Sequence, residues 1–347
     1  MRLFKGEVII LRDITKKFQR LDGLIGHTPL VAIEFEYEGR TCCLYAKTEQ
    51  YNLSGSVKDR VAYHILREAY FRGLIEPGQR IVEATSGNTG ISFAAVGAYL
   101  GHPVEIFMPD WMSTERVRLI ESYGAEVRLV SKEEGGFEGS IAMAEEEGRK
   151  GAFLPRQFEN PLNTDAHKRS TGPEIIQQLE KLNKKADAFV AGVGTGGTLM
   201  GVSSVLKTVN PDFLCCALDP ASSPTLSSGG KRSGEHRIAG IGDDFIPKIV
   251  DLEKVDRMYL AGDGDAINMS RKLSRELGLA VGISSGANFI GAVQAIEELG
   301  PEACVVTCFA DDNKKYLSTD LMYEQPVKDS DLAPKIHLKD LKSYRCD

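Results

Sequence analysis

Lys58 stands in a stretch of residue types that could hold a reactive amine. Residues 54–60 read Ser-Gly-Ser-Val-Lys-Asp-Arg, so small residues precede a lysine at the expected start of a helix. The positive end of a helix and the neighbouring Arg60 both favour the neutral form of the Lys58 amine. Because a neutral amine condenses with an aldehyde, the pattern predicts a covalent link to a carbonyl compound. The alternative is a lysine exposed on a helix surface.

Two polar turns are expected to open helices elsewhere in the chain. Residues 85–90 read Thr-Ser-Gly-Asn-Thr-Gly, and residues 282–287 read Gly-Ile-Ser-Ser-Gly-Ala. The first offers hydroxyls, an amide and backbone N–H groups, which suit a carboxylate or a ring oxygen at a helix start. The second offers hydroxyls that could meet a heterocyclic nitrogen. Simple helix capping is the alternative for both turns.

A third turn is richer in glycine. Residues 192–198 read Gly-Val-Gly-Thr-Gly-Gly-Thr. Only glycine lets so many backbone amides converge on one anion, so the turn predicts a phosphate site. Gly192, Gly194 and Gly197 also satisfy the spacing of a dinucleotide-binding turn, with Asp219 placed 22 residues beyond Gly197. These residues alone leave a nicotinamide dinucleotide and a phosphate-bearing cofactor equally open.

The turns follow short β-branched runs, which alternate with longer amphipathic segments. This alternation predicts parallel sheets covered by helices, with ligands at the carboxyl edge of the strands. Expected strands are 30–33, 42–46, 80–83, 104–108, 126–130, 188–191, 213–218 and 303–308. Expected helices are 57–72, 89–100, 113–123, 137–150, 172–182, 198–208, 265–277 and 287–299. Residues 221–244 are predicted to form a long mobile loop, and the polar tail 324–347 to pack loosely or to contact another subunit.

Composition narrows the class of protein. A chain of 347 residues predicts two domains or lobes, and 42% hydrophobic with 26% charged residues is typical of a globular protein. The formal net charge of −7 disfavours nucleic-acid and anionic-membrane partners. The seven cysteines include no Cys-x-x-Cys pair, so we expect buried free thiols in the cytoplasm and no metal site. The apolar run near the N-terminus is too short for a signal peptide or a membrane span.

Taken together, the four segments resemble one family of enzymes from about Leu21 to Leu321. The chain is similar to the cysteine synthase and cystathionine β-synthase family, the fold type II pyridoxal-phosphate enzymes. Further segments that carry the resemblance are 25–30 (Ile-Gly-His-Thr-Pro-Leu), 157–161 (Gln-Phe-Glu-Asn-Pro), 171–174 (Thr-Gly-Pro-Glu) and 240–247 (Gly-Ile-Gly-Asp-Asp-Phe-Ile-Pro). The number of separate segments makes the dinucleotide alternative remote.

The resemblance implies an α/β fold of two lobes, each an open, mostly parallel twisted sheet flanked by helices, like the tryptophan synthase β subunit. Residues 60–165 would form a smaller mobile lobe that grips the substrate carboxylate. Residues 1–59 and 166–347 would form the larger lobe, which carries the phosphate cradle and the pyridine site. A homodimer is implied by the resemblance alone.

The resemblance also assigns roles to residues. Lys58 would bind pyridoxal 5′-phosphate covalently, Asn88 would contact its 3′-oxygen, and Ser284 would face its pyridine nitrogen. The phosphate cradle would be Gly194, Thr195, Gly196, Gly197 and Thr198. The substrate would be bound by Thr85, Ser86, Asn88, Thr89, Gln157 and Gly240.

The implied chemistry takes place at the β-carbon of a small amino acid. Lys58 would remove the Cα proton, a leaving group would depart from Cβ, and an aminoacrylate would remain. A neutral serine at the ring nitrogen would not keep the ring protonated, which favours β-elimination or β-replacement over transamination.

Asp243 and Asp244 depart from the small residues that O-acetylserine sulfhydrylases have after Gly-Ile-Gly. A carboxylate there could protonate a departing group or activate water. We therefore expect exchange of sulfur and oxygen at Cβ, with cysteine and water giving serine and hydrogen sulfide, or use of serine and cysteine as in cystathionine β-synthases. The alternatives are synthesis of cysteine from O-acetylserine and sulfide, a solvated acidic loop without a catalytic role, a noncatalytic homologue and, remotely, an NAD-dependent oxidoreductase.

Overall fold

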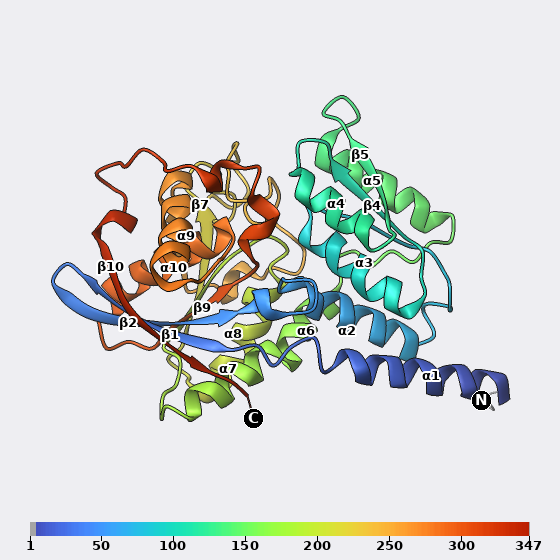
Figure 1. Ribbon diagram of the computed structural model, residues 1–347, viewed down its shortest axis with the longest axis horizontal. Helices are drawn as coiled ribbons and strands as arrows, with labels where there is room; N and C mark the ends of the chain where they lie inside the picture. Colours follow the sequence, from blue (N-terminus) through green and yellow to red (C-terminus); the bar gives the residue numbers. More distant parts are fainter. Residues whose placement is uncertain (1–4, 347) are drawn as a thin grey trace.

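The fold of residues 5–346, which a computed structural model describes, contains a large and a small sheet side by side (Figure 1). The large sheet has the strand order β10-β1-β2-β9-β6-β7-β8, and the small sheet has the order β3-β4-β5. The strands are β1 (Leu30–Tyr37), β2 (Arg40–Thr48), β3 (Ile81–Ala84), β4 (Val104–Pro109), β5 (Glu126–Val130), β6 (Ala188–Gly192), β7 (Leu214–Pro220), β8 (Arg257–Ala261), β9 (Val305–Phe309) and β10 (Ile336–Tyr344).

Helices cover both sheets. They are α1 (Lys5–Leu21), α2 (Lys58–Phe71), α3 (Asn88–Leu100), α4 (Thr114–Ser122), α5 (Gly136–Arg149), α6 (Pro161–Arg169), α7 (Thr171–Glu180), α8 (Gly197–Val209), α9 (Asp263–Leu277) and α10 (Ile283–Leu299). Each of the eight strands and eight helices expected from the sequence is confirmed, with ends shifted by a few residues. This is the α/β architecture that the alternating pattern predicts.

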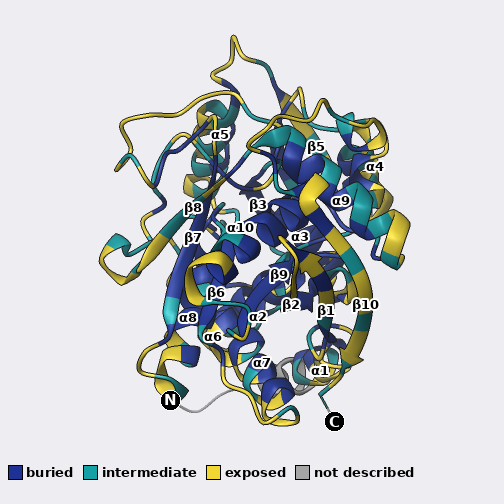
Figure 2. Ribbon diagram, turned by 90° about the vertical axis from the view of Figure 1, so that its left-hand side faces the viewer, coloured by how far each residue is buried: buried dark blue, intermediate teal, exposed yellow. Residues whose placement is uncertain are grey.

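The central strands of the large sheet are apolar on both sides, and that explains their position. Along β6 and β7, Val190 and Leu218 face the core cluster of α9 and α10, whereas Phe189 and Ala217 face the cluster of α7 and α8. Strands that must be buried on two faces read as continuous apolar runs. Helix α10 packs against β6 and β9 of the sheet and is buried along almost its whole length (Figure 2).

The two edges of the large sheet were not predicted. Residues 336–344 form β10, which pairs antiparallel with β1, so the prediction of a loosely packed tail is wrong for this segment. Ile336, Leu338 and Leu341 explain the pairing, because they pack against the core cluster while the charged residues between them face outward. At the other edge, β8 pairs in parallel with β7.

Helices α1 and α6 were also missed. Ile14, Phe18 and Leu21 of α1 are buried in the same cluster as Val61 and Ile65 of α2, which gives the N-terminal helix an apolar face. Residues 221–244 contain no helix or strand, as predicted. Arg237 nevertheless connects this segment to the C-terminal part of the chain, through contacts with Asp320 and with Gln325 at 2.7 Å.

The carboxyl ends of the parallel strands in both sheets point toward one region. The turn after β3 lies in the small sheet, and the turn after β6 lies in the large sheet; both contribute walls to one cavity. Helix α2 lies between them, in contact with α3 and α6. Ligands bind at such carboxyl edges in open α/β sheets, so the chemistry is expected here.

Candidate active site

Lys58 is the first residue of α2 and faces the cavity between the sheets. Its Nζ atom donates a hydrogen bond to Thr195 Oγ1 at 3.2 Å, in the glycine-rich turn after β6. Burial lowers the pKa of the Lys58 amine from its ordinary value of 10.5 to about 8. A substantial neutral fraction is therefore present near pH 8, as a nucleophilic amine requires.

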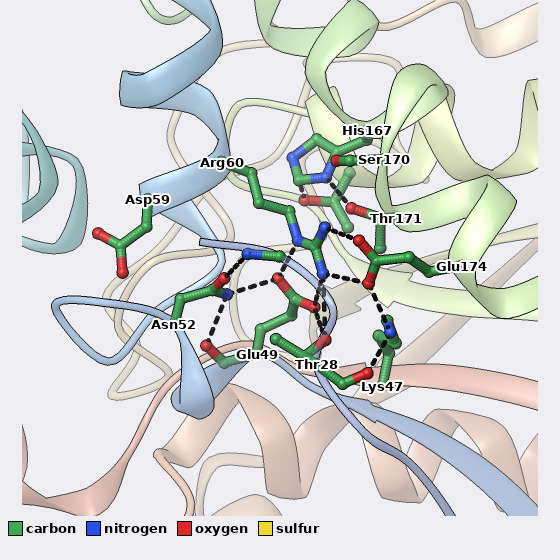
Figure 3. A network of polar contacts seen from close by, with 12 residues as sticks. Thr28, Lys47, Glu49, Asn52, Asp59, Arg60, His167, Ser170, Thr171 and Glu174 are labelled. Atoms are coloured by element: carbon green, nitrogen blue, oxygen red, sulfur yellow. Dashed lines mark hydrogen bonds and ion pairs between the residues drawn. The ribbon is translucent and has the colours of Figure 1, made fainter. Parts of the chain in front are cut away.

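Arg60 does not contribute to this shift as the sequence suggested. Its guanidinium binds two carboxylates, with Nε 2.6 Å from Glu49 Oε2 and Nη1 2.6 Å from Glu174 Oε1 (Figure 3). Glu174 also pairs with Lys47 at 2.7 Å. The charge of Arg60 is thus compensated, and desolvation of Lys58 is the first cause of its lowered pKa. This buried network fixes the base of α2 in place.

The glycine-rich turn packs so closely against neighbouring segments that side chains do not fit at its glycines. A Cβ atom at Gly194 would overlap the carbonyl oxygen of Gly240, and one at Gly197 would overlap the side chain of Asn163. Gly196 has a φ of +86° at the N-cap of α8, a conformation that favours glycine. Backbone amides at a helix start, with no side chain above them, form an anion site.

Asn88 begins α3 and reaches from the small sheet toward the large lobe. Its Nδ2 atom donates to Asp311 Oδ2 at 2.8 Å, and Tyr316 donates to the same oxygen at 2.7 Å. The Oδ1 atom of Asn88 is buried without a hydrogen-bond partner among the described residues. An amide held on one side and unsatisfied on the other requires a polar guest in the cavity.

The remaining polar residues line the same space. Thr89 Oγ1 donates to Gln157 Oε1 at 2.6 Å, and Gln157 Nε2 donates to the backbone oxygen of Ala84 at 2.7 Å. These bonds hold the turn 85–89 and Gln157 together in the wall of the cavity. Ser284 lies in the first turn of α10 and lines the opposite wall.

Asp243 and Asp244 are adjacent in sequence but differ in location. Asp243 lines the deep cavity, whereas Asp244 is exposed and lines only the outer mouth. Burial, and secondarily the charge of Asp244, raises the pKa of the Asp243 carboxyl from 3.8 to about 6. His236 supports this loop, because its Nε2 lies 3.0 Å from the carbonyl oxygen of Gly242 and donates to it. Asp243 is thus an ionisable group in the cavity that contains Lys58.

The cavity brings together most of the residues predicted from the sequence. It contains about 840 Å³ of space not filled by atoms, including its opening. Its walls include Lys58, Thr85, Ser86, Asn88, Thr89, Gln157, Gly194, Thr195, Gly196, Thr198, Gly240, Asp243 and Ser284. Gly197 and Asp244 were predicted but are not part of these walls.

The sequence did not single out three residues near the cavity. Arg116 lines it directly, Asp311 binds Asn88, and Asn163 donates to Thr195 Oγ1 at 2.9 Å. Asp219, which fitted a dinucleotide site, instead accepts a hydrogen bond from the backbone of Ser227 at 3.0 Å.

Other kinds of site are not found in the part of the chain described. The seven cysteines, which all lie within it, are free thiols. Within residues 5–346, no cluster of three His, Cys, Asp or Glu side chains could hold a metal ion. No helix there is both long and apolar enough to cross a lipid bilayer.

A family model described as pyridoxal-phosphate dependent enzyme matches residues 21–311. The cavity fits this cofactor on three observations: an amine with a pKa lowered to about 8, an anion site of glycine amides, and the unsatisfied Asn88 amide. Lys58 would hold the aldehyde, the turn 194–198 the phosphate, and Asn88 and Ser284 the ring. Of the two cofactors left open by the glycine spacing, pyridoxal phosphate is confirmed.

Known relatives show which pyridoxal-phosphate dependent enzymes the chain is similar to in sequence. The chain is 43% identical to a cysteine synthase of Staphylococcus aureus over 307 residues, which cover 88% of this chain and 97% of the relative. It is also 43% identical to a probable cysteine synthase of Bacillus subtilis over 86% of this chain and 96% of the relative.

A solved structure of a hydrogen sulfide-producing enzyme from Fusobacterium nucleatum is similar throughout. It matches with a TM-score of 0.93 and 50% identity, covering 96% of this chain and all of that one. A mutant of that enzyme in complex with an α-aminoacrylate intermediate matches with a TM-score of 0.92 and 50% identity, over 94% of this chain and 99% of that chain. The protein therefore belongs to the cysteine synthase family of pyridoxal-phosphate dependent enzymes, which replace or eliminate a group at the β-carbon of a small amino acid.

Proposed function

We propose that the enzyme converts L-cysteine and water into L-serine and hydrogen sulfide. The Cβ–S bond of cysteine breaks, a Cβ–O bond to water forms, and the proton removed from Cα returns to it. The single observation that carries this proposal is the presence of Asp243 beside Lys58 in the deep cavity, with a pKa of about 6. A carboxylate of this kind is ionised at neutral pH and sufficiently basic to activate water.

Each step is assigned to a residue of this chain. The turn 85–89 and Gln157 bind and orient the substrate carboxylate. Lys58 takes the proton from Cα and later returns it. Asp243 accepts a proton from the water that adds at Cβ, and this proton passes to the released HS− to give hydrogen sulfide. The bound cofactor supplies the electron sink that makes loss of the Cα proton possible.

The similar structures support this choice of substrate. The Fusobacterium nucleatum enzyme is described as hydrogen sulfide-producing, and its mutant was captured with an α-aminoacrylate intermediate. Hydrogen sulfide production is the outcome expected when the sulfur of cysteine is the leaving group.

Asp243→Asn is expected to lower the rate of serine and sulfide formation from cysteine about 100-fold, because the amide cannot accept a proton. In wild type the same rate should fall as the pH drops below about 6, since protonation removes the base. This acidic limb should be missing in Asp243→Asn. Asp244→Asn is the matched control, because its side chain lies in the outer mouth; its rate should stay within about twofold of wild type. Equal rates in wild type and Asp243→Asn would contradict the proposal.

A second candidate is the synthesis of cysteine from O-acetylserine and sulfide, which the two 43% identical cysteine synthases favour. Both reactions use the same lysine and the same carboxylate-binding turn. They differ in the group that leaves and in the nucleophile. Product analysis with cysteine alone, and with O-acetylserine plus sulfide, separates the two, and the larger kcat/KM identifies the better substrate pair.

Recombination of the apoenzyme with pyridoxal phosphate should depend on pH. Only the neutral Lys58 amine attacks the aldehyde, and its pKa is lowered to about 8. The rate of colour development should therefore rise up to about pH 8 and then level off. An exposed lysine would give a rate that still rises at pH 10. Stopped-flow absorbance at a series of pH values measures this, and a continuing rise above pH 9 would contradict the burial of this amine.

The arrangement of lobes and subunits also remains a proposal. We propose that residues 60–165, which include the small sheet, close as a unit over the substrate, and that the protein is a homodimer. Small-angle scattering with and without serine tests the closure, and the molar mass in solution tests the dimer.

The proposed nucleophile is water, with sulfide as the product.

A further inference from the structure

Arg116 is a buried cation that has no ionic partner among the residues that the structure describes. It lies in α4 and is 4% exposed. Among the described residues no carboxylate lies within 4.0 Å of its nitrogens. Its guanidinium donates a hydrogen bond to Ser113 Oγ at 3.4 Å and lies over the ring of Tyr316, 4.5 Å from its centre. A buried charge with so little compensation is costly unless an anion completes the site.

The side chain of Arg116 runs along the back of the turn that is assigned to the substrate carboxylate. A Cβ atom at Gly87, in the middle of that turn, would overlap Arg116 Cδ and lie 2.7 Å from Nε. The absence of a side chain at Gly87 is what lets the arginine approach. Arg116 lines both the deep cavity and its outer mouth, so its charge acts on the space in front of the turn.

The cavity has little other positive charge to offer a carboxylate. Among the described residues, Lys58 and Arg116 are the only cationic side chains in its walls. The Lys58 amine is used for the cofactor. Thr85, Ser86 and Gln157 are neutral, and the negative charge of Asp243 repels the substrate carboxylate. The α-carboxylate of a bound amino acid therefore depends on Arg116 for electrostatic compensation.

Asp311 does not take this role from the substrate. Burial raises the pKa of the Asp311 carboxyl, and the charges of Lys315 and, to a smaller extent, Arg116 lower it. The Oδ2 atom of Asp311 accepts hydrogen bonds from Asn88 and Tyr316. These two hydrogen bonds hold Asp311 against Asn88 and Tyr316, and among the ion pairs of the described residues none joins Asp311 to Arg116, so the guanidinium is available to another anion.

We propose that Arg116 is the fixed cation that selects substrates carrying a free α-carboxylate. Because the guanidinium also lies over the ring of Tyr316, which lines the outer mouth, it connects the carboxylate-binding turn to that part of the mouth. Arg116 is thus a specificity-determining and positioning residue, which takes no part in proton transfer. This inference deepens the proposed function and rests on it for the amino-acid substrate.

The test compares cysteine with cysteine methyl ester, which lacks the negative charge. In wild type kcat/KM should be lower for the ester by on the order of 100-fold, through KM more than kcat. In Arg116→Met, kcat/KM for cysteine should fall while kcat/KM for the ester stays similar. The ratio of the two values should therefore shrink to about 3-fold. Arg116→Lys keeps a charge and should retain an intermediate ratio. The matched control is Arg118→Met, an exposed arginine of the same helix, with a wild-type ratio.

A second measurement does not depend on sulfide release. The holoenzyme is titrated with serine and with serine methyl ester, and binding is followed by the absorbance of the cofactor. The ratio of the two dissociation constants then measures the preference for a free carboxylate. If sulfide is not formed but this ratio still collapses in Arg116→Met, the proposed reaction fails and the role of Arg116 stands. A ratio unchanged in both Arg116→Met and Arg116→Lys, with normal cofactor content, would leave Arg116 as a purely structural residue and overturn the inference.

Discussion

Replacing Lys58 with alanine is expected to lower the formation of serine and sulfide from cysteine by at least about 10³-fold. The substitution removes both the covalent attachment of pyridoxal phosphate and the base that takes the Cα proton. The Lys58 amine donates a 3.2 Å hydrogen bond to Thr195 in the glycine-rich turn, which places it at the proposed cofactor site. The loss should appear in kcat, because the turn that binds the substrate carboxylate is untouched.

Borohydride reduction followed by mass spectrometry gives a readout that does not require turnover. Wild type should gain the mass of the reduced cofactor on the peptide that contains Lys58, and Lys58→Ala should gain none. Lys58→Arg separates charge from chemistry, because a guanidinium retains the charge but supplies no neutral amine. Lys231→Ala, at an exposed lysine, is the control and should be labelled like wild type. Labelling of another lysine in wild type would contradict the assignment.

The strands that build the active site were predictable because they are buried. β3, β6 and β9 are short apolar runs without charged residues at their centres, apart from Glu83, and a turn follows each of them. β10 was missed for the opposite reason. Its charged and polar residues face solvent, and its pairing with β1, which is about 300 residues away in sequence, is not encoded locally.

Local sequence also singled out the glycine-rich turn and Lys58 as candidates, and the resemblance to the family assigned their roles. Arg116 could not be recognised in this way. An arginine within an amphipathic helix normally faces solvent, as Arg118 does two residues later. Only the packing of α4 against Gly87 and Tyr316 makes Arg116 part of the cavity.

Asp243 and Asp244 also could not be distinguished from the sequence alone. Both carboxylates fitted a catalytic role, and the sequence offered no way to choose between them. The choice depends on the positive φ of Gly242, +76°, and on the hydrogen bond from His236 to the Gly242 carbonyl, which together set the direction of the chain. Asp243 consequently faces the cavity and Asp244 the solvent. Desolvation then raises the pKa of the inward residue.

Gly194→Ala is expected to weaken the binding of pyridoxal phosphate on the order of 1,000-fold. This factor corresponds to the loss of about two hydrogen bonds to a charged phosphate. The added Cβ would overlap the carbonyl oxygen of Gly240 and lie 3.3 Å from its carbonyl carbon. Both atoms belong to the backbone, so no side chain can rotate to make room. Either the phosphate turn or the segment that precedes Asp243 must move.

Equilibrium dialysis of the apoenzyme against pyridoxal phosphate measures this affinity, and circular dichroism checks that the variant is folded. Gly264→Ala is the matched control, because Gly264 lies within α9 and a Cβ there would meet Gln325 Cβ at an ordinary distance of 3.4 Å. It should bind the cofactor like wild type. Wild-type affinity in Gly194→Ala would mean that the phosphate is not held by these amides. A loss of affinity in Gly194→Ala alone would place the phosphate over the start of α8, where the helix dipole and the free backbone amides act on the same anion.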